Sequence, residues 1–249
     1  MRNSPQKITL CIDLFYRGVS TRKVQEHLQA FYPHNSSHKS IYKWIVKYAS
    51  QISSFTDKLK VKVGSEIQVD EVEYHRRKSS NSKQGIDANW FVDSVDTDTR
   101  FLVASNYCKT RSYEELKQVM KDIKRKSITL PKIITTDGYT AYLGIVKKVF
   151  GYSLYTKQYA VKHNVVTARK GEGFNYPIER LHNSLRARTK TFRGFHGSVE
   201  SANAIMKGLA IYYNFITKHQ ALNCCPYELA TDLKLNSENK WLELINLSA

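Results

Sequence analysis

The chain has 249 residues, and its 39 Lys and Arg exceed its 22 Asp and Glu by a formal charge of +17. Hydrophobic residues make up 41% and aromatic residues 12%, which is enough for a packed core and excludes an intrinsically disordered chain. No apolar run approaches the roughly 20 residues of a membrane span, so we expect no membrane partner, and the charge favours nucleic acid before an anionic membrane surface.

Three helices are predicted over the first 50 residues, because apolar side chains recur there at helical spacing. Gly18 and a break at 33–36 separate them, and Ser20 and Ser36 or Ser37 are the expected N-caps of the second and third helices. The expected inward residues are Ile8, Cys11, Ile12 and Phe15, then Val24, Leu28 and Phe31, then Ile41, Trp44, Ile45 and Tyr48.

The third of these helices carries a basic stripe opposite its apolar face. Lys39, Lys43 and Lys47 follow one another at intervals of four residues. A short basic helix backed by two others is the helix-turn-helix arrangement, whose last helix enters the major groove of DNA. We therefore predict a helix-turn-helix DNA-binding domain at 1–52 and a linker at 53–64; the alternative is a stripe that only solvates one face of a helical bundle.

From residue 66 the pattern changes to strands alternating with helices. The segments 66–74, 88–96 and 100–108 are β-prone, and the last two form a hairpin to whose turn we assign Asp93, Asp96 and Asp98. The later elements are a helix opened by the capping box of Ser112 and Glu115, a strand at 132–137, and helices at 139–150, from 175 or 177, and at 198–217. This order predicts an α/β fold, a mixed sheet flanked by helices over 65–230, followed by a C-terminal tail at 231–249.

Three carboxylates on separate elements are candidate metal ligands. Asp70 lies within the first predicted strand, Asp137 ends the strand at 132–137, and Glu179 lies on the following helix. Hard oxygen ligands in a basic protein suit two Mg²⁺ ions that act on phosphate. Glu71 is expected to point to the opposite face of the strand, so that only Asp70 reaches a shared site. Asp137 before Gly138 also fits turn chemistry, and Glu179 also fits a helix N-terminus.

The helix that bears Glu179 is polar and basic on one side. His182, Asn183, Arg186 and Lys190 follow Glu179 at spacings that share one helical face, and the basic surface is extended by Arg180, Arg188 and Arg193. A carboxylate among such groups indicates a phosphate site, whereas a buried helical face would be apolar. The alternative is a solvated helix without a ligand.

The ordered set of segments resembles the DDE transposases of short bacterial and archaeal insertion sequences, in the transposase and retroviral-integrase superfamily. The segments are FYRGVSTRKVQEHL and SIYKWIVKY, VDEVE, WFVDSVDTDTRFLVASNYCKTRS, IITTDGYTAY, IERLHNSLRARTKTFRGF and AIYYNFITKHQALN. No single segment is specific, but their order over nearly the whole chain is.

This resemblance implies a ribonuclease-H-like catalytic core at 65–230, with Asp70, Asp137 and Glu179 as a catalytic triad that binds two Mg²⁺ or Mn²⁺ ions. It also implies a cytoplasmic, nucleoid-associated transposase that acts as a homo-oligomer on terminal inverted repeats and target DNA. The expected reaction is cleavage and strand transfer by in-line phosphoryl transfer. Two alternatives remain, an inactive relative that only binds DNA and a metal-dependent nuclease that never joins strands.

Overall fold

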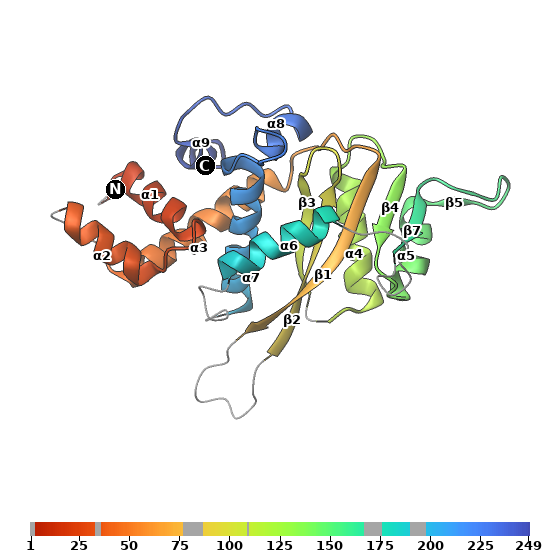
Figure 1. The fold of residues 1–249 in the computed structure, drawn as a ribbon, viewed down its shortest axis with the longest axis horizontal. Coiled ribbons are helices and arrows are strands. Elements are labelled where there is room, and N and C mark those ends of the chain that lie inside the picture. The colour runs from red at the N-terminus through yellow and green to blue at the C-terminus, as the bar shows by residue number, and fades with distance from the viewer. Residues whose placement is uncertain (1–2, 33–35, 77–86, 109, 167–175, 190–197) are drawn as a thin grey trace.

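The computed structural model describes residues 3–32, 36–76, 87–108, 110–166, 176–189 and 198–249 (Figure 1). The N-terminal helices lie on one side of a mixed sheet, and the helix that begins at Val199 lies between them and the sheet (Figure 1). Within these ranges, no helix has both the length and the apolar character needed to cross a membrane.

The three N-terminal helices are confirmed as α1 (Pro5–Tyr16), α2 (Thr21–Phe31) and α3 (His38–Thr56). Ser20 and Ser37 cap α2 and α3, because each hydroxyl accepts the backbone N–H three residues further on. The expected inward residues are buried or pack against the core, except Phe31, which is 69% exposed. That prediction was wrong because Phe31, at the very end of α2, packs on the ring of His27 at 4.8 Å on the surface.

Helix α3 is longer than the sequence pattern indicates. It continues to Thr56 and packs along α7 (Val199–Ile211), so it enters the range predicted as a linker. Val61 in the same range is buried and its N–H donates to the carbonyl of Lys126. The boundary between an N-terminal and a catalytic domain stays a prediction.

Within the described residues, five strands form one mixed sheet in the order β3-β2-β1-β4-β7. They are β1 (Glu66–Arg76), β2 (Asp87–Asp96), β3 (Leu102–Cys108), β4 (Ile133–Thr136) and β7 (Lys162–Val165). The first three pair antiparallel, whereas β4 is parallel to β1 and β7 to β4. This confirms a mixed α/β sheet, and its order is consistent with a ribonuclease-H-like core.

Helices cover both faces of the sheet. Figure 1 shows α6 (Tyr176–Thr189) in front of β1, and α4 (Tyr113–Lys126) and α5 (Ala141–Phe150) on the other side. The predicted Ser112 does cap α4, since its hydroxyl accepts the N–H of Glu115, whereas the Glu115 carboxylate accepts the N–H of Thr110. The predicted helix at 198–217 is α7 followed by a turn of π-helix, η3 (Tyr212–Ile216).

Short elements complete the chain. A small hairpin pairs β5 (Tyr152–Ser153) with β6 (Gln158–Tyr159), and α8 (Pro226–Ala230) follows η3. The range predicted as a C-terminal tail contains α9 (Lys240–Leu247). This last helix returns to the N-terminal helices, where the indole N–H of Trp241 donates to Asp13 at 3.2 Å.

One aromatic contact joins the N-terminal helices to the rest of the molecule. Tyr16, at the end of α1, is completely buried and its ring stacks on Trp241 at 5.4 Å and on Tyr212 at 6.3 Å. Its hydroxyl and ring edge lie directly over the backbone of Gly208 in α7. The helices α1 to α3 and the sheet therefore share a single hydrophobic core.

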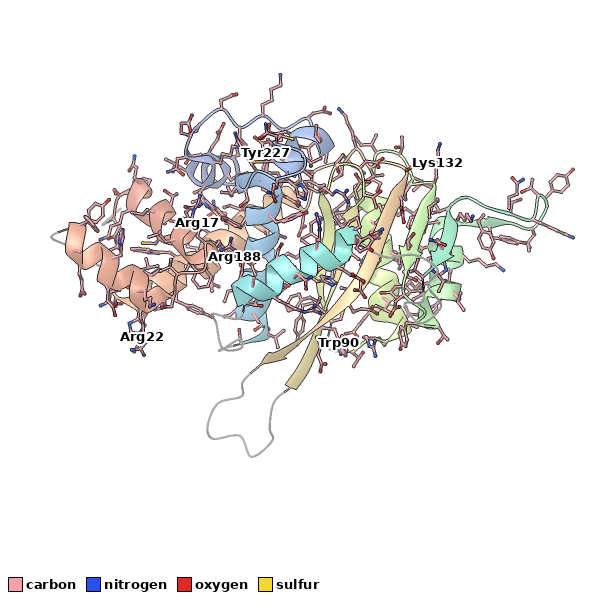
Figure 2. The ribbon with its side chains drawn as sticks, viewed as in Figure 1. Arg17, Arg22, Trp90, Lys132, Arg188 and Tyr227 are labelled. Atoms are coloured by element: carbon pink, nitrogen blue, oxygen red, sulfur yellow. The ribbon has the colours of Figure 1, made fainter. Side chains whose placement is uncertain are left out.

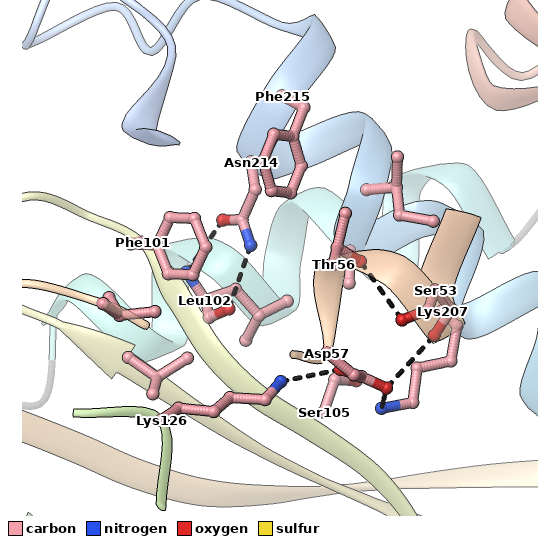
Figure 3. A pocket seen from close by; sticks show the side chains of 14 residues that line it. Ser53, Thr56, Asp57, Phe101, Leu102, Ser105, Lys126, Lys207, Asn214 and Phe215 are labelled. Carbon is pink, nitrogen blue, oxygen red and sulfur yellow. Dashed lines mark hydrogen bonds and ion pairs between the residues drawn. The ribbon is translucent and has the colours of Figure 1, made fainter. Parts of the chain in front are cut away.

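A polar junction fixes the end of α3 against the sheet (Figure 3). Asp57 forms ion pairs with Lys126 at 2.7 Å and Lys207 at 3.2 Å. The side-chain amide of Asn214 spans both backbone groups of Leu102 at 2.8 and 2.9 Å. Burial alone would raise the pKa of Asp57, but the two lysines hold it below its usual value.

Replacing Asp57 with Asn is expected to destabilise the protein by about 1 to 2 kcal/mol, because Lys126 then stays buried without its counter-charge. Since the pKa of Asp57 is lowered in the folded state, its contribution is present at neutral pH and is lost as the pH falls through that lowered value. Urea unfolding of both proteins at pH 7 and pH 3 measures this effect. A constant difference in free energy between the two pH values would contradict it.

Candidate active site

Asp70 and Asp137 meet where two parallel strands separate. The last paired residues of β1 and β4 are Gln68 and Thr135, and β4 ends one residue later. Two positions beyond that pair, Asp70 continues along β1 and Asp137 leaves the end of β4. The carboxyl ends of parallel strands form the crevice in which such folds bind ligands.

A third carboxylate belongs to this group. One side-chain oxygen from each of Asp70, Glu71 and Asp137 can be chosen so that all three lie within 4.8 Å of one another. The prediction that Glu71 cannot reach a site shared with Asp70 was therefore wrong. Alternation fixes the direction of Cβ, but β4 no longer borders β1 at this point, so the longer Glu71 side chain reaches the same crevice from the other face.

Asp137 also fulfils its alternative role in the turn, because its Oδ1 accepts the backbone N–H of Tyr139 at 3.0 Å. This bond fixes one carboxylate oxygen close to the start of α5. The turn and the carboxylate group use the same residue, so the two interpretations are compatible.

The pKa of Glu71 departs strongly from its ordinary value. The residue is 9% exposed, and its Oε1 is buried without a hydrogen bond of good geometry among the described residues, although the buried Tyr142 hydroxyl is close enough to act to lower the pKa of Glu71. Burial raises the pKa of Glu71 to about 7, and the negative charges of Asp137 and Asp70 add to that effect. A buried carboxylate beside two further carboxylates is suited to a divalent cation that takes oxygen ligands.

Without metal, Glu71→Gln is expected to stabilise the protein at pH 8 by about 2 to 3 kcal/mol. The unfolded carboxyl loses its proton near pH 4.5 and the folded one near pH 7, so the wild type loses stability as the pH rises between these values. At pH 4.5 the difference should fall below about 1 kcal/mol. Thermal unfolding in EDTA at both pH values provides the measurement, and a variant less stable than the wild type at pH 8 would contradict the expectation.

Behind Asp70, a buried histidine lies between two carboxylates. Asp93 is directly opposite Asp70 in the β1–β2 register, and His182 on α6 contacts Asp70 at 3.4 Å and Asp93 at 3.2 Å. Burial alone would lower the pKa of His182, but the two carboxylates raise it to about 9. The imidazolium is therefore charged at neutral pH and holds Asp70 toward α6.

The assignment of Asp93 to the hairpin turn was wrong, because this residue is completely buried in the middle of β2. Asp96 and Asp98 do serve the turn region: Asp96 accepts the N–H groups of Thr99 and Gly64, and Asp98 accepts that of Ser65. The sequence did carry a signal for a buried Asp93, because this acid interrupts the apolar run WFVDSV.

Glu179 lies apart from the three clustered carboxylates in the part of the chain that the structure describes. It is exposed in the first turn of α6, next to Ile178, whose N–H donates to Gln68 of β1 at 3.3 Å. His182, predicted to share its polar face, is instead buried against the sheet, because a histidine paired with two carboxylates is accommodated in the core. The role of Glu179 as a third ligand stays a prediction.

The predicted DNA-binding cations are placed as follows. Lys39, Lys43 and Lys47 are all exposed on α3, and Arg180 and Arg186 are exposed on α6. Arg188 is half-buried and donates to the carbonyl of Arg17 at 2.7 Å, which ties α6 to the end of α1 (Figure 2). Lys190 and Arg193 lie outside the described residues.

A stacked arginine beside the acids was missed by the sequence analysis. The guanidinium of Arg111 lies over the rings of Trp90 at 4.3 Å and Tyr139 at 4.9 Å. The Tyr139 hydroxyl also donates to the carbonyl of Arg111 at 3.1 Å, so both ends of the residue are held. This arrangement fixes a positive charge close to Glu71, whose pKa it acts to lower.

No protein-family model matches the chain, and no curated protein sequence does. Among solved structures, the chain is similar to a pre-cleavage Mos1 transpososome, with 8% identity, a TM-score of 0.32, and coverage of 100% of this chain and 79% of that one. A Mos1 strand transfer complex gives 10% identity and a TM-score of 0.27 over 84% and 76% of the two chains. A Mos1 transposase paired-end complex gives 10% and 0.26 over 86% and 78%. TM-scores below 0.5 do not establish a shared fold.

Proposed function

We propose that this chain is a metal-dependent DNA transposase that cleaves and joins DNA strands by phosphoryl transfer. The observation that carries the proposal is the convergence of Asp70, Glu71 and Asp137 where β1 and β4 separate. The strong net positive charge of the chain, +17, supports a polyanionic substrate.

Asp70 and Asp137 are the proposed holders of Mg²⁺ or Mn²⁺, and Glu179 completes the set from α6. Bound divalent ions would lower the pKa of an attacking water or hydroxyl and stabilise charge on the leaving oxygen. The chain's own part is positional: the imidazolium of His182 orients Asp70, and the turn at Tyr139 orients Asp137. Cleavage and joining can share one site because both exchange one oxygen for another on phosphorus.

The lysines and arginines that the sequence predicts as DNA-binding residues are also part of this proposal. Lys39, Lys43 and Lys47 on α3 would read the element ends, and Arg180, Arg186 and Arg188 on α6 would contact phosphates near the carboxylates, as would Lys190 and Arg193. Their support is their common charge and the exposure of the described residues other than Arg188, which is half-buried. The protein is proposed to act as an oligomer that pairs two DNA ends.

The test is a strand-transfer assay with purified protein, Mg²⁺ and DNA that carries the sequences flanking the gene. Joined product that disappears in EDTA is the expected result. Nicking without joined product would support a nuclease instead, and tight DNA binding without nicking or joining would support an inactive DNA-binding relative. Either of these two outcomes overturns the transposase proposal.

A further inference from the structure

A groove with a volume of about 960 Å³ opens on the side of α6 that faces η3 and the loop after it. One wall is α6, from Tyr176 to Arg188, and the other is formed by α7, η3 and the segment 217–221. Arg100, from the turn between β2 and β3, contributes to the lining. The groove thus adjoins the helix that carries Glu179, on the side away from Asp70 and Asp93.

The described lining of this groove is positively charged. Four of these residues are cations, and none is an Asp or Glu; the cations are Arg100, Arg180, Arg188 and Lys218. Burial lowers the pKa of His219, and the charges of Arg100 and Arg180 lower it further. Arg100 and Arg180 come from distant parts of the chain, and both therefore lie close enough to His219 to lower its pKa.

Arg100 has an unusual backbone for a residue with a side chain, since its φ of 61° lies in the left-handed region. Glycine occupies this region more readily at a turn, so an arginine there carries a conformational cost that function can explain. Its backbone N–H donates to the carbonyl of Asp96 at 2.9 Å, which fixes the turn. The Arg100 side chain therefore extends from a turn whose backbone is held by this hydrogen bond.

Aromatic rings accompany the charges. Tyr212 and Tyr213 line the groove from η3, and Tyr176 lines it from the start of α6 with 57% of its surface exposed. In the loop after η3, which lines the opposite wall, the N–H of His219 donates to the carbonyl of Cys224 at 2.8 Å. Cations along a groove with an exposed aromatic ring are the features with which proteins bind single-stranded nucleic acid.

We propose that this groove binds an unpaired DNA strand, with Arg100, Arg180 and Lys218 on its phosphates and Tyr176 stacked on a base. The volume is at the upper end of the range for small-molecule sites, about 300 to 1,000 Å³, which suits one to a few nucleotides. This inference rests on the proposed function and deepens it, because it assigns a place on the protein to a DNA strand that is separated from its partner.

The test measures binding of a fluorescein-labelled oligothymidylate of about 15 nucleotides to the full chain in EDTA, by fluorescence anisotropy over a range of salt concentrations. The double variant Arg100→Gln and Lys218→Gln is expected to bind about 10-fold more weakly, and the salt slope should decrease by about 1.4 because two phosphate contacts are lost. Tyr176→Ala is expected to weaken binding about 10-fold and to reduce the quenching of a 2-aminopurine base in the oligonucleotide.

The matched control is the double variant Lys121→Gln and Lys132→Gln, which removes the same charge at two exposed lysines outside the groove lining. Its affinity should stay within about 2-fold of the wild type, and Arg100→Lys with Lys218→Arg should retain binding. Equal losses in the groove and control variants, wild-type binding by both groove variants, or binding of duplex but not of the oligonucleotide would overturn the inference.

Activity distinguishes this inference from the proposed function. A wild-type protein that joins DNA ends but does not bind the oligonucleotide refutes the groove alone. A protein that binds the oligonucleotide through the groove but neither cleaves nor joins DNA refutes the transposase proposal alone.

Discussion

Asp70→Asn is expected to lower the rate of Mg²⁺-dependent DNA cleavage by about 10³-fold or more in a variant that still folds. The substitution removes one negative charge from the carboxylate group while keeping an oxygen that can accept a hydrogen bond from His182. Because the variant also loses one of the two charges that pair with the buried His182 imidazolium, a modest decrease in melting temperature is expected as well, and the rate is measured at a temperature at which both proteins are folded. Nicking of DNA under single-turnover conditions, together with thermal unfolding, measures both quantities.

Two further substitutions serve as comparisons for Asp70→Asn. Asp232 is an exposed aspartate that pairs with Lys62 on the surface, and Asp232→Asn should leave the cleavage rate within about 2-fold of the wild type. Glu179→Gln tests the third proposed ligand and should reduce the rate by a factor comparable to that for Asp70→Asn. An Asp70→Asn variant with wild-type activity would refute the proposed metal site, whereas an active Glu179→Gln variant would remove only Glu179 from it.

Gly208→Ala is expected to destabilise the protein by at least about 3 kcal/mol. A Cβ atom at this position of α7 would overlap the hydroxyl and Cζ of Tyr16. A flexible surface side chain would move away at little cost, but Tyr16 is fully buried and held between Tyr212 and Trp241. The free energy of unfolding from urea titrations provides the measurement.

A double-mutant cycle isolates the cause of this effect. In a Tyr16→Ala background the overlap is absent, so Gly208→Ala should become neutral or stabilising, as expected for alanine in a helix. Gly144→Ala in α5 is the matched control, since its new Cβ would meet only Tyr113 at an ordinary 3.7 Å. A cost at Gly208 that persists without the Tyr16 ring would contradict the steric explanation.

The helices and most of the sheet could be predicted from the sequence because they follow simple periodicities. Apolar spacing and serine caps located α1 to α3, and β-prone alternation located β1 to β3. The edge strand β7 was missed, because KHNV is short and its side chains are only exposed or half-buried, so it has no apolar pattern. Its existence depends on pairing with β4, which is a long-range contact.

The candidate site was only partly predictable for a related reason. The β-prone patterns placed Asp70 within a strand and Asp137 at the end of another, but their meeting depends on the parallel pairing of β1 with β4, which is a long-range contact. The inclusion of Glu71 depends on where β4 stops bordering β1, and the contacts of His182 with Asp70 and Asp93 depend on how α6 lies across the sheet. Neither the end of the β1–β4 pairing nor the position of α6 on the sheet can be read from a local sequence pattern.

The contact between α1 and α9 also bears on how this protein is made. Trp241 and Asp13 are 228 positions apart, and Asn239 and Thr9 form a second bond of the same kind. At synthesis rates of about 5 to 20 residues per second, α1 would wait about 10 to 45 seconds for its partner. During that interval the surface of Tyr16 that Trp241 later covers is open to solvent or to chaperones. The N-terminal helices therefore reach their final packing only after translation has passed residue 241.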